Sequence, residues 1–388
     1  MRAWFEGGWC AALACVVCVV AMGCGSTQGP VANSTGSGSG GSGSPGSMNG
    51  QLGGDDAAVP PIDEETGDDG SDASSADAAS ADASPESSIA ADGAPAPGSM
   101  GSPAPPPVAT GCVTDLTAGH RVVSCQGITH NLTVPEQCLT QTCGLIFDVH
   151  GGTMSGDMED KNTQLAEIAP PMGFIVVQPN ANNGLWDATT DDPLVLSFLE
   201  NVRDAFHVDV RHIHMTGISQ GGYMSWRFLC AHTDLFGSVA PAAAAGQANI
   251  SVETGCTFTG TDVPTGEMDI LYMHGTQDAL VNFPNAIVLR DAVIAYYGMD
   301  AGTVLTTDGT FTRTRYSTPS GRVFEFIQHN YLTNSMFAGV AIKGHCFPGS
   351  PDQSVTLPNQ LMSFGCDPPN SFTWGQEVLK FFIAHPKP

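Results

Sequence analysis

Short apolar segments of strand length alternate with longer segments of helical spacing over the last two-thirds of the chain. The predicted strands cover residues 145–149, 174–177, 212–216, 238–240, 269–273 and 340–342. The predicted helices cover residues 194–206, 222–230, 287–297 and 374–384. This alternation is typical of a mostly parallel sheet that is covered by helices on both faces. The pattern therefore predicts an α/β fold whose functional loops follow the carboxyl ends of the strands.

The first 111 residues have a different composition and predict no folded domain. After Arg2, an apolar stretch from Trp9 to Met22 has the length of a signal peptide and is short for a membrane span. Residues 25 to 110 are almost entirely Gly, Ser, Ala, Pro, Asp and Glu, which cannot bury enough apolar surface to offset chain entropy. We therefore predict three parts, a signal peptide, a disordered linker and one folded domain, at residues 1–23, 24–111 and 112–388.

The end of the predicted signal peptide indicates how the protein is exported. Ala21-Met22-Gly23-Cys24 resembles a bacterial lipobox, in which the cysteine is lipidated, although Ala21 stands where Leu is usual. Ala21 and Gly23 also fit an ordinary small-x-small cleavage site. We therefore expect an extracellular protein, either an outer-membrane lipoprotein anchored through Cys24 or a fully secreted one. The long linker after Cys24 favours the anchored form.

The net charge excludes some classes of binding partner, and the cysteine content indicates the cellular compartment. The formal net charge of -26, with no Lys or Arg between residues 3 and 120, argues against nucleic acid and anionic lipid as partners. Eight cysteines follow residue 111, and an even number in an exported protein predicts disulfides. Pairing of cysteines that are close in sequence predicts Cys112–Cys125, Cys138–Cys143, Cys230–Cys256 and Cys346–Cys366.

The segment Gly217-Ile218-Ser219-Gln220-Gly221 carries the strongest chemical signal of the chain. It matches G-x-S-x-G, the nucleophile elbow of serine hydrolases, and lies between a predicted strand and a predicted helix, as an elbow requires. Such a turn exposes the serine hydroxyl at the edge of the sheet. We therefore predict Ser219 as the nucleophile, with the backbone N–H of Gln220 as one donor to the oxyanion.

Two further residues occur in the chain order that a Ser-Asp-His triad has in this fold. Asp278 follows the predicted strand 269–273, and His345 follows the predicted strand 340–342. Both should therefore reach the same sheet edge as Ser219, with His345 as the base and Asp278 as the acid that orients it. The loop after strand 145–149 predicts Gly152 as the second oxyanion donor, because a glycine N–H can approach an oxyanion closely.

These motifs together resemble the secreted polyhydroxybutyrate depolymerase and feruloyl esterase family, α/β-hydrolases related to carbohydrate esterase family one. The resemblance is carried by residues 184–186, 208–211, 217–225, 234–236, 239–241, 274–278 and 344–349. It implies an α/β-hydrolase fold and supports Ser219, Asp278 and His345 as the triad. It also implies ester substrates, either polyhydroxyalkanoates or feruloylated or acetylated plant polysaccharides, and no cofactor.

The sequence departs from that family at two points that bear on substrate choice. Phe347 stands where a Trp is frequent, and Gln328 to Phe337 resembles an insertion before the last strand. No separate polymer-binding domain is recognisable. We assign Trp186 and His150 as candidate substrate-binding residues, although the Gly-Gly pair after His150 favours a role in shaping the loop.

Three alternatives stay open beside the esterase interpretation. His212 and His214 share one strand face, but without a nearby carboxylate at ligand spacing we predict no metal site. The other two alternatives are a binding protein on a hydrolase scaffold without catalysis and a peptidase of the same fold. Oligomeric state and acyl specificity are not predicted by the sequence.

Overall fold

The computed structural model describes residues 101–245, 255–337, 339–352, 355–357 and 360–388. The predicted signal peptide, Cys24 and the linker up to residue 100 lie outside the described residues. Part of the predicted linker packs on the folded unit: Ala104 N–H donates to Thr140 O, and Val108 N–H donates to Ala205 O. The folded unit therefore begins before Cys112, where the sequence placed its boundary. Within the described residues, every helix is too short or too polar to cross a membrane.

A ten-stranded sheet forms the centre of the unit, in the order β1-β2-β4-β3-β5-β6-β7-β10-β9-β8. The strands are β1 (Gly119–Cys125), β2 (Ile128–Val134), β3 (Gly144–Val149), β4 (Phe174–Asn180), β5 (Ile213–Ile218), β6 (Ser238–Ala242), β7 (Asp269–Gly275), β8 (Thr303–Thr307), β9 (Phe311–Ser317) and β10 (Val323–His329). The central strands from β4 to β10 pair in parallel, whereas β1, β2, β8 and β9 form antiparallel margins. Strands β3, β5, β6 and β7 are buried along their whole length, which explains their continuous apolar sequences.

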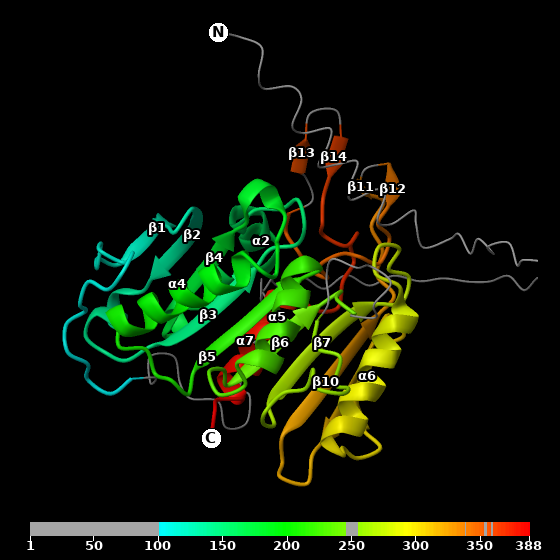
Figure 1. The fold of residues 1–388 in the computed structure, drawn as a ribbon. Helices are drawn as coiled ribbons and strands as arrows, with labels where there is room; N and C mark the ends of the chain where they lie inside the picture. Colours follow the sequence, from blue (N-terminus) through cyan, green and yellow to red (C-terminus); the bar gives the residue numbers. More distant parts are fainter. Residues whose placement is uncertain (1–100, 246–254, 338, 353–354, 358–359) are drawn as a thin grey trace, which may run out of the picture. The chain divides into compact units, whose positions relative to one another are not determined.

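Helices cover both faces of the sheet (Figure 1). The helices are α2 (Gly156–Thr163), α3 (Leu165–Ile168), α4 (Asp191–Ala205), α5 (Gln220–Ala231), α6 (Phe283–Tyr297) and α7 (Trp374–Ala384), with 3-10 turns η2 (Glu136–Leu139), η3 (Pro170–Met172) and η4 (Asn182–Gly184). Apolar residues of α4, α5 and α6 share one core with one face of the sheet, and those of α3 and α7 share a second core with the other face. The predicted α/β fold is confirmed, and its topology is that of an α/β-hydrolase.

The strand predicted at residues 340–342 is present in part, but it does not belong to the central sheet. Residues Val340–Ala341 form β12 in a separate two-stranded sheet with β11 (Met336–Phe337), and the strand beside β7 is β10. The prediction missed β10 because Glu325 interrupts its apolar pattern. Arg313 and Arg315 of β9 pair with this fully buried carboxylate. Strand β10 extends to His329 and so includes the first two residues of the predicted insertion from Gln328.

A last hairpin and four disulfides complete the described unit. Strands β13 (Val355–Leu357) and β14 (Gln360–Met362) pair with each other in antiparallel orientation. All four disulfides predicted from sequence proximity are present: Cys112–Cys125, Cys138–Cys143, Cys230–Cys256 and Cys346–Cys366.

Candidate active site

Ser219 occupies a strained turn between β5 and α5. Its backbone has φ 53° and ψ -118°, a conformation that costs a non-glycine residue about 1–3 kcal/mol and that is concentrated at functional sites. The side chain is half-buried. A Cβ on Gly221 would lie 1.9 Å from the carbonyl oxygen of Val149, so this turn requires glycine there. The structure therefore has the geometry of a nucleophile elbow at the predicted position.

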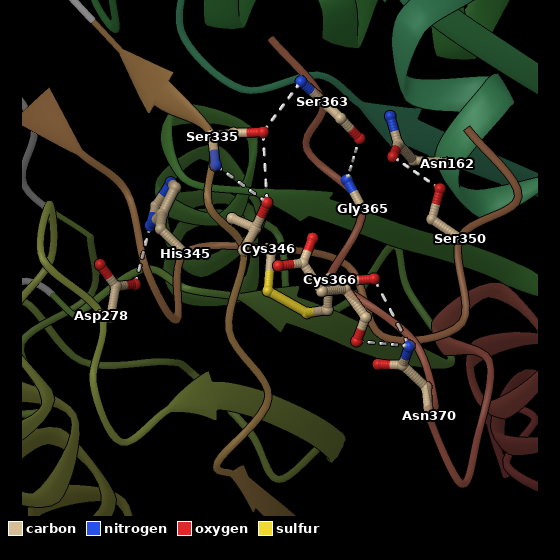
Figure 2. The surroundings of a disulfide bond; sticks show 12 residues. Asn162, Asp278, Ser335, His345, Cys346, Ser350, Ser363, Gly365, Cys366 and Asn370 are labelled. Atoms are coloured by element: carbon tan, nitrogen blue, oxygen red, sulfur yellow. Dashed lines mark hydrogen bonds and ion pairs between the residues drawn. A yellow bond between two sulfur atoms is a disulfide. The ribbon is translucent and has the colours of Figure 1, made fainter. Parts of the chain in front are cut away.

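Asp278 and His345 are in direct contact, as the sequence predicted. The Nδ1 of His345 lies 2.7 Å from Oδ2 of Asp278, and both side chains are buried (Figure 2). The other carboxylate oxygen, Oδ1, accepts the backbone N–H groups of Leu280 and Val281, each at 2.8 Å. With an ionised carboxylate, His345 donates from Nδ1, and its Nε2 is left as the proton acceptor.

The charge state of Asp278 is set by opposing effects. Burial alone would raise the pKa of this carboxyl, but the neighbouring His345 and His274 and its hydrogen bonds hold that pKa below its usual value. Asp278 is therefore an ionised partner for His345 at neutral pH. Stabilisation by the ionised carboxylate is present above its unfolded pKa and is lost only as the pH falls through the lower folded value.

A second buried histidine, for which no role was predicted from the sequence, supports Asp278. His274 Nε2 lies 2.8 Å from the carbonyl oxygen of Val281 and 3.5 Å from Oδ2 of Asp278. Because a carbonyl only accepts, Nε2 carries the hydrogen, and Nδ1 accepts the hydroxyl of Tyr272 at 2.9 Å. His274 therefore ties the turn that holds Asp278 to strand β7. The motif His274-Gly275-Thr276-x-Asp278 is the sequence feature from which a role for His274 beside Asp278 could have been predicted.

The loop that carries His345 is held by contacts that are distant in sequence. The backbone N–H of Gly344 donates to Gln277 O at 3.2 Å, and Cys346 is bonded to Cys366. The next residue, Phe347, is fully buried and exchanges backbone hydrogen bonds with Phe364 and Cys366. Figure 2 shows the disulfide directly beside His345. The loop thus replaces the sheet strand that the sequence had predicted before the histidine.

Strand pairing brings the elbow and the acid–base pair to one edge of the sheet. The N–H of Ser219, after β5, donates to Ala242 O at the end of β6, and Ala243 N–H donates to Met273 O in β7, both at 2.9 Å. Asp278 follows β7 directly. All three predicted triad residues therefore lie at the carboxyl edge of neighbouring parallel strands, where α/β folds bind ligands.

The loop after β3 lies against the elbow. A Cβ on Gly152 would lie 3.0 Å from Oε1 of Gln220, so Gly152 and Gln220 are adjacent. Thr153 N–H donates to Gly184 O at 2.5 Å and Met154 N–H donates to Gly151 O at 3.1 Å. The N–H groups of Thr153 and Met154 are thus bonded within the protein, while Gly152 N–H has no acceptor among the described residues. This geometry agrees with Gly152, rather than Thr153 or Met154, as the oxyanion donor.

Trp186 and His150, which were predicted to bind substrate, are buried in the protein. Only 2% of Trp186 and none of His150 is exposed. The Nε1–H of Trp186 donates to His150 O at 2.8 Å, and Nε2 of His150 accepts Ala181 N–H at 3.1 Å. Burial lowers the pKa of His150 to about 4, which leaves the ring neutral. These contacts favour support of the loop over the predicted contact with substrate.

Two groups of described residues carry side chains of the kind that metals bind, a histidine pair and a cluster of two cysteines and one aspartate. His212 and His214 lie with ring centroids 6.0 Å apart, and burial lowers the pKa of both. Among the described residues, one group has metal-ligand spacing, formed by Cys230, Cys256 and Asp262. Its two sulfurs are joined in a disulfide and are not available as thiolates.

The chain is similar to two fungal esterases. It is 24% identical over 202 residues to a probable feruloyl esterase C of Aspergillus niger, covering 50% of this chain and 71% of that protein. It is 26% identical over 218 residues to feruloyl esterase C of Emericella nidulans, covering 53% of this chain and 77% of that protein. No family model matches the chain.

Among solved structures, the fold is similar to an acetyl xylan esterase from Aspergillus awamori. The TM-score is 0.45 and the identity 15%, over 54% of this chain and 93% of that one. The class of protein that the fold defines is an α/β-hydrolase. With its similarity to feruloyl esterases, the chain is a carboxylic ester hydrolase.

Proposed function

We propose that this protein hydrolyses carboxylic esters of the hydroxycinnamoyl type through Ser219, His345 and Asp278. The observation that carries the proposal is the 2.7 Å contact between His345 and Asp278 at the sheet edge that also bears the strained Ser219. Similarity to two feruloyl esterases supports a hydroxycinnamoyl group as the acyl part of the substrate. The triad order and the elbow support the mechanism.

In the first step, Nε2 of His345 takes the proton of the Ser219 hydroxyl while the oxygen attacks the ester carbonyl. The imidazolium that forms is stabilised by the buried carboxylate of Asp278. The backbone N–H groups of Gln220, at the N-terminus of α5, and of Gly152 bind the oxyanion of the tetrahedral intermediate. The intermediate collapses, the alcohol leaves with the proton from His345, and an acyl-enzyme ester remains on Ser219.

In the second step, water attacks the acyl-enzyme after giving a proton to His345. The second tetrahedral intermediate expels Ser219, which recovers its proton from the histidine, and the free acid leaves. Each step uses the same base and the same oxyanion donors, so no cofactor is required for balance. Loss of one oxyanion donor typically costs about 3 kcal/mol of barrier.

We also propose that the enzyme acts outside the cell. Four disulfides in the described residues support an oxidising compartment, and the sequence of residues 1–24 supports export with lipidation of Cys24. In this proposal the linker between Cys24 and the folded unit tethers the enzyme at the membrane surface. Replacing Cys24 by Ala should release the protein to the medium, as measured by fractionation.

The test is hydrolysis of a panel of esters by wild type and by Ser219→Ala, each with its disulfides formed. The panel contains methyl ferulate, p-nitrophenyl acetate, p-nitrophenyl butyrate and 3-hydroxybutyrate oligomers. We expect methyl ferulate to be the best substrate and Ser219→Ala to lose about 10⁴-fold or more of kcat without change in circular dichroism.

Other outcomes have defined meanings. Preference for 3-hydroxybutyrate oligomers would replace the hydroxycinnamoyl substrate by a polyester and leave the triad in place. Equal turnover by wild type and Ser219→Ala would refute the mechanism. Absence of turnover, together with no labelling by a fluorophosphonate, would favour the binding-protein alternative.

A further inference from the structure

Two carboxyl groups lie buried together beneath the loop that carries Gly152. Asp148, in β3, and Glu159, in α2, are both fully buried. Each side chain is within hydrogen-bonding range of the other, so each affects the ionisation of its partner. Neither residue forms an ion pair with a basic side chain among the described residues. Two ionised carboxylates in such a place would repel each other at a cost of several kcal/mol, so one proton is expected between them.

The hydrogen-bond partners of the pair lead to the same conclusion. Oδ2 of Asp148 accepts the hydroxyl of Thr163 at 2.7 Å, and Gln178 Nε2 approaches it at 3.4 Å. Within the described residues, no donor makes a well-aligned hydrogen bond to Oδ1 of Asp148 or to either oxygen of Glu159. The backbone N–H of Gly151 lies beside the carboxyl of Glu159 without reaching that geometry. An acid proton shared between the two carboxyls supplies the donor that these acceptors lack.

The pair faces a segment whose peptide planes are held at both ends. In the peptide between His150 and Gly151, the oxygen accepts Trp186 Nε1–H, and the N–H lies by the carboxyl of Glu159. In the next peptide, between Gly151 and Gly152, the oxygen is 2.7 Å from Nδ1 of His150. Because a peptide is planar, fixing that oxygen also fixes the direction of Gly152 N–H.

We propose that Asp148 and Glu159 share one proton and act as a positioning pair for the Gly152 amide in the oxyanion hole. The inference rests on the proposed function, since it assigns the Gly152 amide its role. The shared proton keeps the carboxyl of Glu159 beside Gly151 N–H. When the last proton leaves, repulsion between the two charges moves Glu159 and releases the loop.

The groups around Asp148 and Glu159 raise the pKa values of the pair, so the pair holds its proton strongly. Burial raises the pKa of Asp148 to about 7, and burial followed by the Asp148 charge raises the pKa of Glu159 well above its usual value. Asp160 on α2 adds a further negative charge, whereas Thr163, Gln178 and the Gly151 amide act in the opposite direction. The two apparent pKa values belong to the pair as a whole, and the pair holds its last proton to a higher pH than an isolated carboxyl does.

The experiment compares pH profiles of kcat/KM for wild type, Glu159→Gln, Glu159→Ala and Asp148→Asn. Wild type should lose activity as the pH rises above neutral and the pair gives up its last proton. Glu159→Gln and Asp148→Asn replace the shared proton by a permanent amide donor, so each should stay within about threefold of wild type at neutral pH and lose this alkaline decline. Glu159→Ala should lose about tenfold or more at every pH, because a small displacement of an oxyanion donor is costly. Glu167→Gln, which changes an exposed glutamate on α3, is the matched control and should match wild type.

Two results would overturn the proposal. One is an alkaline decline that is unchanged in Glu159→Gln and Asp148→Asn. The other is loss of wild-type activity in EDTA with recovery in Ca²⁺, which would replace the proton by a divalent cation on the same oxygens.

A separate readout distinguishes failure of the pair from failure of the proposed esterase. If wild type shows no Ser219-dependent turnover, the proposed function fails, and the proton is then tested by thermal unfolding alone. A carboxyl with a raised folded pKa stabilises the fold at low pH and loses that contribution as the pH rises through the folded value. Wild type should therefore lose Tm between about pH 5 and 9, and Glu159→Gln should lose less. Equal slopes would refute the shared proton independently of catalysis.

Discussion

The nucleophile and the base of the proposed triad are held in different ways. Ser219 lies in a turn of five consecutive residues, and its strained backbone is enforced by the flanking strand, helix and glycines. His345 lies in an irregular loop that is fixed by a disulfide to Cys366 and by backbone contacts to the segment around Asp278, 67 residues earlier. The nucleophile thus depends on local geometry, whereas the base depends on contacts between distant segments.

The largest expected effect comes from a substitution at Asp278, which disturbs the base His345 and leaves the nucleophile Ser219 in place. Asp278→Asn leaves the elbow intact but removes the carboxylate that orients His345, so kcat should fall about 10⁴-fold. The rate of hydrolysis of p-nitrophenyl acetate measures this effect. Asp262→Asn, at an exposed aspartate before β7, is the control and should retain full activity. A tenfold or smaller loss in Asp278→Asn would show that another group orients His345.

The next effect tests whether the disulfide beside His345 positions the base. We expect Cys346→Ala/Cys366→Ala to lower kcat about 10- to 100-fold, because a displacement of about 1 Å is enough for such a loss. Cys138→Ala/Cys143→Ala removes a disulfide at the amino end of β3 and should keep kcat. Both pairs should lose stability, by about 2–4 kcal/mol in urea unfolding. Equal kcat in the two double variants would mean that the disulfide near His345 contributes stability alone.

The smallest effect concerns the loop beside the elbow. Trp186→Phe removes the hydrogen bond to His150 O but keeps an aromatic ring, so a loss of about 1 kcal/mol, or about fivefold, is expected. If Trp186 holds the loop, the loss should fall on kcat with methyl ferulate, and KM should stay constant. A rise in KM with unchanged kcat would restore the predicted contact between Trp186 and substrate.

The sequence predicted those parts of the fold in which the local pattern and the tertiary environment agree. Strands β3, β5 and β7 are buried on both faces, so their apolar segments were recognisable. Strand β10 was missed because its buried Glu325 is compensated by arginines from β9, which no local pattern indicates. The margins β1, β8 and β9 were also absent from the prediction, since their exposed or partly exposed residues follow no continuous apolar pattern. Strand β2 is largely buried, but polar residues such as His130 and Asn131 interrupt its apolar pattern.

The same distinction between local pattern and tertiary environment applies to the candidate site. The sequence by itself determined the elbow, the order of Ser219, Asp278 and His345, and the pairing of cysteines, because each depends on residue type and short spacing. The tertiary structure decided which strand lies beside β7, that His274 supports Asp278, that Trp186 and His150 are buried, and that Asp148 lies beside Glu159. These features depend on burial and on contacts between segments that are distant in sequence, and both arise only when the sheet has brought its carboxyl edge together.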